Sequence, residues 1–87
     1  MPSDPVVGAW AWEDKTTVKI FDNGTFQRGK DSGSWRRETG TNEIILNWDI
    51  GFIDKLTLSS DGKSMKGKGY HKDRPNKTWP IGGTKIN

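Results

Sequence analysis

The chain lacks cysteine, has a single histidine and contains no long apolar run. Without cysteine it has no disulfide scaffold, no thiol nucleophile and no cysteine-based metal site. The single histidine, His71, excludes a polyhistidine metal cluster. A membrane-spanning helix needs about 18 or more consecutive apolar residues, so we expect no membrane span. No charged segment followed by an apolar one opens the sequence, so we expect no secretion signal in it.

Aliphatic residues are also sparse, and aromatic residues take their place. The 87 residues include five Trp, three Phe and one Tyr within a hydrophobic fraction of 30%. A buried aromatic side chain removes about 150–250 Å² from water, so these rings must supply much of the core of one small domain. Eleven Gly and four Pro argue against long helices. Residues 1–5, with Pro2 and Pro5, are expected to be a lead-in or linker remnant, which leaves 6–87 as the domain.

Positive charge is concentrated near the C-terminal end of the chain. Residues 63–87 carry seven basic side chains and one acidic one, whereas 1–62 carry seven basic and ten acidic ones. Such asymmetry is typical of a surface that meets a polyanion, either nucleic acid or an acidic polysaccharide. The plainer interpretation is a solvated, lysine-rich strand that discourages edge-to-edge aggregation. The candidate anion-binding residues are Lys66, Lys68, Lys72, Arg74 and Lys77.

Apolar residues recur with the two-residue period of β-strands and nowhere with sustained helical spacing. Asn23-Gly24 and Asp61-Gly62 are turn signals, because Asn, Asp and Gly adopt positive φ at little cost. The sequence therefore predicts an all-β domain, an antiparallel meander of seven or eight short strands. Closure into a barrel hides the edges of so small a sheet; an open curved sheet and a two-sheet sandwich are the alternatives. The expected strands are 6–12, 16–21, 25–28, 33–38, 43–48, 52–59, 64–70 and 78–81, with 84–86 as a further short one.

The same alternation predicts which side chains face the core. Asp54 is the exception among them, because it shares a strand face with Phe52, Leu56 and Leu58. Burial of a carboxylate is costly unless hydrogen-bond donors reach it, and indole N–H groups or turn amides are the expected donors. Asp54 is therefore either a structural aspartate at a rim or turn, or a ligand-binding carboxylate. The other side chains expected on core faces are Trp10, Trp12, Val18, Ile20, Ile44, Leu46, Trp48 and Met65.

Several short motifs resemble those of small bacterial lipocalin-like (calycin-like) domains. Together they have the form G-x-W, strand, D-N-G-T-F, G-x-W, strand, D-x-L-x-L-S-x-D-G, and they cover residues 8–69. This resemblance implies a β-barrel and indicates no particular activity. An eight-stranded barrel is about wide enough inside for side chains or for one small ligand. With these Trp residues inside, we expect little free space and recognition at the exterior. The matching segments are Gly8–Trp10, Thr17–Phe26, Gly33–Trp35, Ile45–Trp48, Asp54–Leu58 and Ser60–Gly62.

The residues that carry chemistry indicate binding rather than catalysis. His71 lies in a charged segment, 71–77, that we expect to be a loop, and a loop is a poor support for a preorganised base. The spacing of the acidic residues selects no two-carboxylate pair of the glycosidase type. We therefore expect no enzyme activity, no metal and no cofactor. The carboxylates available for such a pair are Glu13, Asp14, Glu43, Asp49 and Asp54.

Tryptophan is more abundant than packing alone requires, which favours a ligand-binding role. Indole faces stack on sugar rings, and on bases where basic groups surround them. Trp35 and Trp79 lie in short strands between polar neighbours and are candidates for exposure, and Tyr70 shares a strand face with lysines. The leading hypothesis is a non-catalytic module that binds a carbohydrate, with Trp35, Trp79, Tyr70 and Asp54 as ligand-binding residues.

Two further hypotheses stay open at this point. One is binding of a polyanion through the basic segment 63–77. The other is a protein-interaction or assembly role, because a short meander can leave an edge strand through which two copies form a homo-oligomer.

Overall fold

Turn glycines divide the chain into strands, as the sequence predicts. The computed structural model describes residues 5–13, 15–38 and 40–86. In it, Gly24, Gly51 and Gly62 adopt positive φ, and each lies between two successive strands. The strands are β1 (Gly8–Trp12), β2 (Thr17–Ile20), β3 (Thr25–Arg28), β4 (Asp31–Arg37), β5 (Glu43–Trp48), β6 (Phe52–Leu58), β7 (Ser64–His71) and β8 (Arg74–Lys85).

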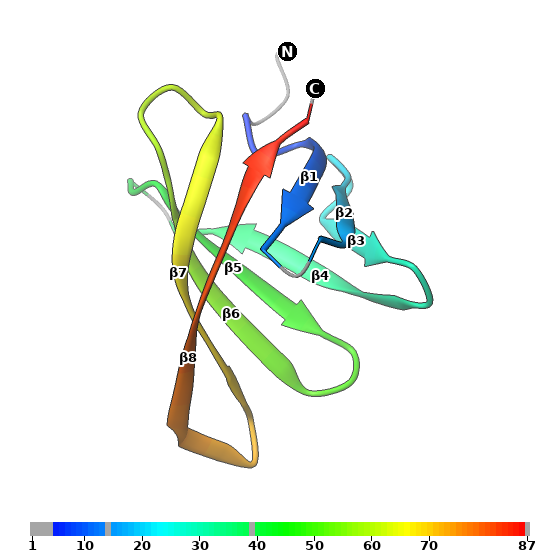
Figure 1. Cartoon of the computed structure of the whole chain (residues 1–87), viewed down its shortest axis with the longest axis vertical. Helices are drawn as coiled ribbons and strands as arrows, with labels where there is room; N and C mark the ends of the chain where they lie inside the picture. Colours follow the sequence, from blue (N-terminus) through cyan, green and yellow to red (C-terminus); the bar gives the residue numbers. More distant parts are fainter. Residues whose placement is uncertain (1–4, 14, 39, 87) are drawn as a thin grey trace.

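Each strand pairs in antiparallel fashion with the next, and β8 returns to β1, so the sheet closes into a barrel (Figure 1). This confirms the expected all-β meander of eight strands closed as a barrel. Within the described ranges there is no helix, and hence none long and apolar enough to cross a membrane.

The C-terminal hairpin is more extended than the sequence indicates. The expected strands 78–81 and 84–86 are parts of the single strand β8. The predicted bounds of the loop, 71–77, are wrong, because β7 continues to His71 and β8 already begins at Arg74. The pairing of the two strands persists to this point across a register shift between Tyr70 and His71.

The contact between β1 and β8 that closes the barrel is short. It runs over three residue pairs, from Trp10 opposite Lys85 to Trp12 opposite Gly83. Because β8 is 12 residues long, its first part, 74–81, pairs only with β7 among the described residues. The β7–β8 hairpin therefore projects beyond the end of β1 (Figure 1).

The first part of β8 is a free edge of the sheet on the side away from β7. The Gly82 carbonyl accepts the Glu13 N–H at 3.2 Å, so Gly82 directs its backbone groups toward β1. By alternation Pro80 directs its backbone the same way, and proline has no N–H to offer there. A proline on a free edge makes that edge a poorer template for pairing with a second copy.

The core lies at the end of the barrel where β1 and β8 pair. The predicted core faces are confirmed: the expected apolar side chains are buried there in one cluster, with Phe52 partly buried against it. Val6 is fully buried, and its carbonyl accepts the indole N–H of Trp10 at 2.8 Å. Beside it, Lys85 Nζ donates to the Pro5 carbonyl at 2.6 Å, so the two described ends of the chain lie close together (Figure 1). The remainder of the expected lead-in, residues 1–4, lies outside the described residues.

Glycine on the inner face lets β6 and β7 approach closely. A Cβ atom on Gly67 would overlap the Lys55 carbonyl oxygen and lie 2.8 Å from the Leu56 Cα on the paired strand. Both obstacles are backbone atoms, so only a shift of one strand against the other would relieve the contact. Gly67 therefore marks a close approach of the two backbones.

We predict that Gly67→Ala lowers the free energy of unfolding by about 1–3 kcal/mol, as overpacking typically does. Urea denaturation followed by far-UV circular dichroism measures the change. Ser64→Ala is the matched control, because Ser64 is an exposed residue of the same strand and surface substitutions usually change stability by less than about 0.5 kcal/mol. Equal stabilities of the two variants would contradict this role of Gly67.

Candidate functional site

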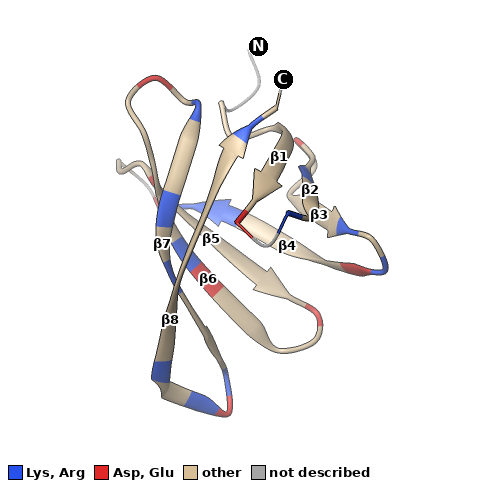
Figure 2. Cartoon of the chain, in the orientation of Figure 1, with Lys and Arg blue, Asp and Glu red and all other residues tan. Residues whose placement is uncertain are grey.

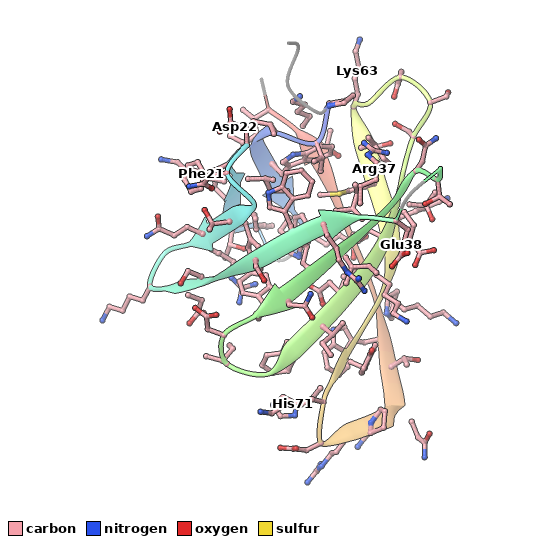
Figure 3. All side chains as sticks on the ribbon, turned by 180° about the vertical axis from the view of Figure 1, so that it is seen from behind. Phe21, Asp22, Arg37, Glu38, Lys63 and His71 are labelled. Carbon is pink, nitrogen blue, oxygen red and sulfur yellow. The ribbon has the colours of Figure 1, made fainter. Side chains whose placement is uncertain are left out.

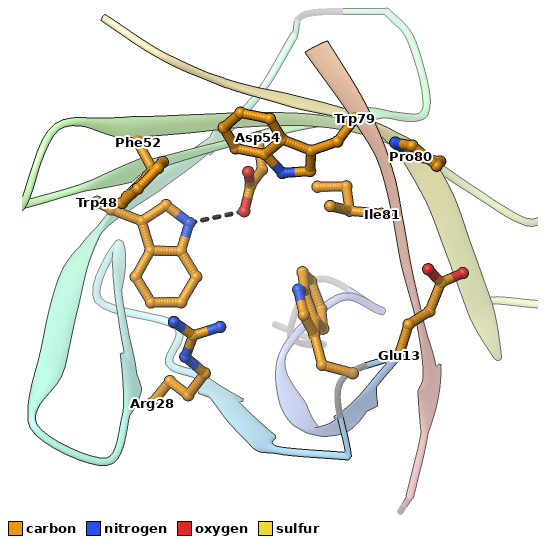
Figure 4. Close-up of a pocket in the computed structure, with 9 residues that line it drawn as sticks. Glu13, Arg28, Trp48, Phe52, Asp54, Trp79, Pro80 and Ile81 are labelled. Atoms are coloured by element: carbon orange, nitrogen blue, oxygen red, sulfur yellow. Dashed lines mark hydrogen bonds between the residues drawn. The ribbon is translucent and has the colours of Figure 1, made fainter. Parts of the chain in front are cut away.

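The end of the barrel away from Val6 is open and holds a pocket of about 410 Å³ (Figure 4). The expectation that side chains fill the interior is therefore wrong at this end. One structural cause accounts for the space: β8 has already left β1 here. The lining residues are Trp12, Glu13, Arg28, Trp48, Phe52, Asp54, Trp79, Pro80 and Ile81.

Aromatic rings form the walls of the pocket. Phe52 packs edge-on against Trp79, with ring centroids 5.8 Å apart, and against His71 at 4.9 Å. Trp48 is held from the core side by Phe26, whose ring meets it edge-on at 4.6 Å. Edge-to-face contacts of this kind stabilise particular ring orientations. The walls are thus held in place by contacts within the protein.

The Asp54 carboxylate is the polar centre of the pocket. It is 5% exposed, and its Oδ2 accepts the Trp48 indole N–H at 2.6 Å (Figure 4). This confirms the expectation that an indole donor compensates for its burial. Burial raises the pKa of Asp54 above its ordinary value, while the Trp48 hydrogen bond and the charge of Arg28 oppose this shift.

Gly69 lets this carboxylate and the Trp79 indole pack against the backbone of β7. It is paired directly with Asp54 between β6 and β7. A Cβ atom on Gly69 would lie 2.5 Å from Asp54 Oδ1 and 2.9 Å from Trp79 Nε1. A hydrogen-bond acceptor and a donor therefore lie near each other over Gly69, where they fill the position that a side chain would take. A hydroxyl group, which both donates and accepts, has the chemistry to pair with both atoms.

Arg28 and Glu13 add charges near the rim. The Arg28 guanidinium lies over the Trp48 ring, 4.6 Å from its centroid, and pairs with Asp31 at 3.7 Å. Glu13 follows β1 and lines the pocket on another side from Trp48 (Figure 4). With Asp54, the lining carries charges of both signs, so neither a strongly anionic nor a strongly cationic ligand is favoured.

The structure brings together two of the four expected ligand-binding residues. Asp54 and Trp79 line the pocket. Trp35 does not line it: its half-buried indole packs on the core and donates to the Phe21 carbonyl at 2.6 Å, which braces the connection between β2 and β3. Tyr70 is half-buried and, by strand alternation, lies on the outer face of β7, with Lys55 Nζ 6.0 Å from its ring centroid.

The expected anion-binding residues all lie on the β7–β8 hairpin, away from the pocket lining. By alternation Lys66 and Lys68 point outward from β7. Lys72, Arg74 and Lys77 are exposed around the projecting end. His71 stands at this end as well (Figure 3). The prediction that His71 lies in a loop is wrong, because His71 is the last residue of β7 and its ring packs on Phe52.

Sequence reasoning missed several lining residues. Trp12 and Trp48 were assigned to the core, and both are indeed buried, but they also border the pocket. Arg28 shares strand parity with the buried Phe26, a signal that was available in the sequence. Of the acidic residues considered, Glu13 and Asp54 line the pocket, while Asp14 lies outside the described residues.

Comparisons with known proteins and a search for metal ligands add no further assignment. No family model, no curated protein and no solved structure matches the chain. In the part of the chain that the structure describes, no group of three or more His, Cys, Asp or Glu side chains is arranged to hold a metal ion.

The raised pKa of Asp54 makes the stability of the folded protein depend on pH, with a sign that follows from the direction of the shift. The folded protein binds this proton more tightly than the unfolded chain. The corresponding stability is fully present below the ordinary pKa of 3.8 and is lost as the pH rises through the folded-state pKa. Asp54→Asn removes the ionisation and keeps an oxygen that can accept the Trp48 N–H. We predict that the melting temperature of this variant rises relative to that of the wild type between about pH 3.5 and about pH 7.

Asp61→Asn is the control of opposite sign. Hydrogen bonds from Ser59 and from the Lys63 backbone lower the pKa of Asp61. The melting temperature of the wild type therefore falls relative to that of this variant as the pH decreases. Differential scanning calorimetry over the same pH range measures both differences. A pH-independent difference for Asp54→Asn would contradict the assignment.

Proposed function

We propose that the domain is a non-catalytic binding module that holds a small hydroxylated ligand, with a saccharide as the ligand class, in the open end of the barrel. One observation carries the proposal: three indoles and a phenyl ring surround a pocket of about 410 Å³. Ligand pockets are typically about 300–1,000 Å³, largely apolar and aromatic, with a few polar groups that fix orientation. This pocket has that composition.

The polar groups support a neutral hydroxylated ligand. Asp54 Oδ1 and Trp79 Nε1 lie near each other over Gly69, and both residues line the pocket, so a sugar hydroxyl at this wall can donate to one and accept from the other. Of the three indoles, that of the half-buried Trp79 offers the stacking surface for the C–H face of a sugar ring. The mixed charges of Glu13, Arg28 and Asp54 favour no large net charge on the ligand.

The contacts that the charged side chains of the pocket make within the protein support binding rather than catalysis. Asp54 Oδ2 is held by Trp48, and Arg28 is held by the Trp48 ring and by Asp31. Glu13 is exposed to solvent. A general acid works best where water is excluded and its pKa is tuned against a partner, whereas a solvated carboxylate at a rim is suited to contact a bound ligand.

We predict that titration with a panel of oligosaccharides at millimolar concentration shifts the intrinsic fluorescence, because the ligand contacts three indoles. Isothermal titration calorimetry then compares variants on the glycan that binds. Trp79→Phe keeps a ring and removes the N–H, so the affinity should fall about twofold to tenfold, the equivalent of one hydrogen bond of about 0.5–1.5 kcal/mol.

Trp35→Phe is the matched control, since the same substitution is made outside the pocket lining. It should leave the affinity unchanged even where it lowers stability through loss of the bond to Phe21. The absence of any fluorescence shift with every glycan, or an equal loss of affinity in the two variants, would refute a saccharide site in this pocket.

A further inference from the structure

The register of the barrel gathers three lysines from two strands on its outer surface. Lys55 on β6 is paired directly with Lys68 on β7, and Lys66 lies two residues along β7 on the same face. All three side chains are exposed. We refer to Lys55, Lys66 and Lys68 as the lysine patch. Lys55 is not among the anion-binding residues that the sequence predicts, because it lies in the acidic part of the chain.

The Lys55–Lys68 pair opposes folding. Directly opposed residues of an antiparallel ladder have Cβ atoms about 4.5–5.5 Å apart, and like charges at that spacing are destabilising. The ion pairs found among the described residues are Arg28–Asp31, Arg36–Glu38 and His71–Asp73, and none includes the patch. A bound anion between the two ammonium groups would relieve the repulsion.

Acidic side chains lie only at the margin of the patch among the described residues. Glu43 is separated from Lys66 by Thr57, which pairs with both. Glu13 lies near Gly82, the partner of Lys66 on β8. Both carboxylates thus flank Lys66, and the positive charge is greatest between Lys55 and Lys68.

Basic residues extend the patch along the hairpin. Lys72, Arg74 and Lys77 are exposed around its projecting end, where Asp73 is the acidic neighbour. Figure 2 shows basic segments recurring along β7 and around this end of the hairpin. The arrangement forms an elongated cationic track, which suits a chain of negative charges better than a single small anion.

Tyr70 provides an aromatic surface beside the patch. It lies two residues beyond Lys68 on the same face of β7, is half-buried, and has Lys55 Nζ 6.0 Å from its ring centroid. An aromatic ring within a basic track is the combination that binds single-stranded nucleic acid, because bases stack on the ring while phosphates meet the cations. A sulfated polysaccharide would use the cations but has no base to stack.

We propose that this face binds single-stranded nucleic acid, with phosphates at Lys55 and Lys68 and a base at Tyr70. The site is separate from the pocket and does not depend on the saccharide proposal. Asp54 and Gly69, on the neighbouring rung of the same ladder, face inward, whereas Lys55 and Lys68 face outward.

The test measures binding of a fluorescein-labelled oligothymidylate of about 20 nucleotides, longer than the roughly 4–16 nucleotides that a small β-barrel covers. The variant is Lys55→Ala/Lys68→Ala. Each phosphate contact on a single strand contributes about 0.7 to the slope of log affinity against log salt. The double variant should lower that slope by about 1.4 and weaken binding at low salt by about tenfold or more.

The matched control is Lys19→Ala/Lys30→Ala, which removes the same charge from two exposed positions elsewhere. It should leave the slope nearly unchanged. Thermal unfolding adds a readout that a merely structural role would not give, because the patch variant should lose binding while its melting temperature rises. Tyr70→Leu should weaken binding with the salt slope preserved.

Two results would overturn the proposal. One is an equal loss of oligothymidylate binding in the patch variant and the control variant. The other is tighter binding of heparin than of oligothymidylate together with an unaffected Tyr70→Leu variant, which would identify a sulfated polysaccharide as the partner of the patch.

Discussion

Three residue pairs between β1 and β8 determine how much of the barrel is enclosed. Where these pairs run, the inner face is filled by Val6, Trp10 and their neighbours. Beyond Trp12, β8 continues with β7 as its partner, and the inner face opens into the pocket. A domain of this length buries a smaller share of its surface than a larger domain does. Its packed core and its open end are therefore two results of the same short closure.

Consecutive rungs of the β6–β7 ladder supply both proposed binding surfaces. Asp54 opposite Gly69 faces the pocket, and Lys55 opposite Lys68 faces outward. A slip of one residue would exchange the two faces of β6 and place a lysine among the indoles. The hydrogen bond from Trp48 to Asp54 is satisfied only in the observed register. One buried bond thereby stabilises the arrangement on which both surfaces depend.

Local patterns predicted much of the fold, because strand alternation and turn glycines act over a few residues. They placed Asp54 on the core face and indicated an indole donor for it. The pocket could not be predicted in this way, since its volume depends on where β8 leaves β1 and on which side chain lies opposite Gly69. Lys55 joins the lysine patch only through the pairing of β6 with β7, which is a property of register rather than of sequence neighbourhood.

The contact of Lys85 with Pro5 also bears on how the domain can be joined to other polypeptides. The described ends of the chain meet at the packed end of the barrel, and the Ile86 N–H donates to the Ala9 carbonyl beside them. Closely spaced ends at a surface are the geometry that tolerates circular permutation and insertion into a host loop. A host chain can therefore enter and leave the barrel at its packed end, and the pocket lies at the opposite end.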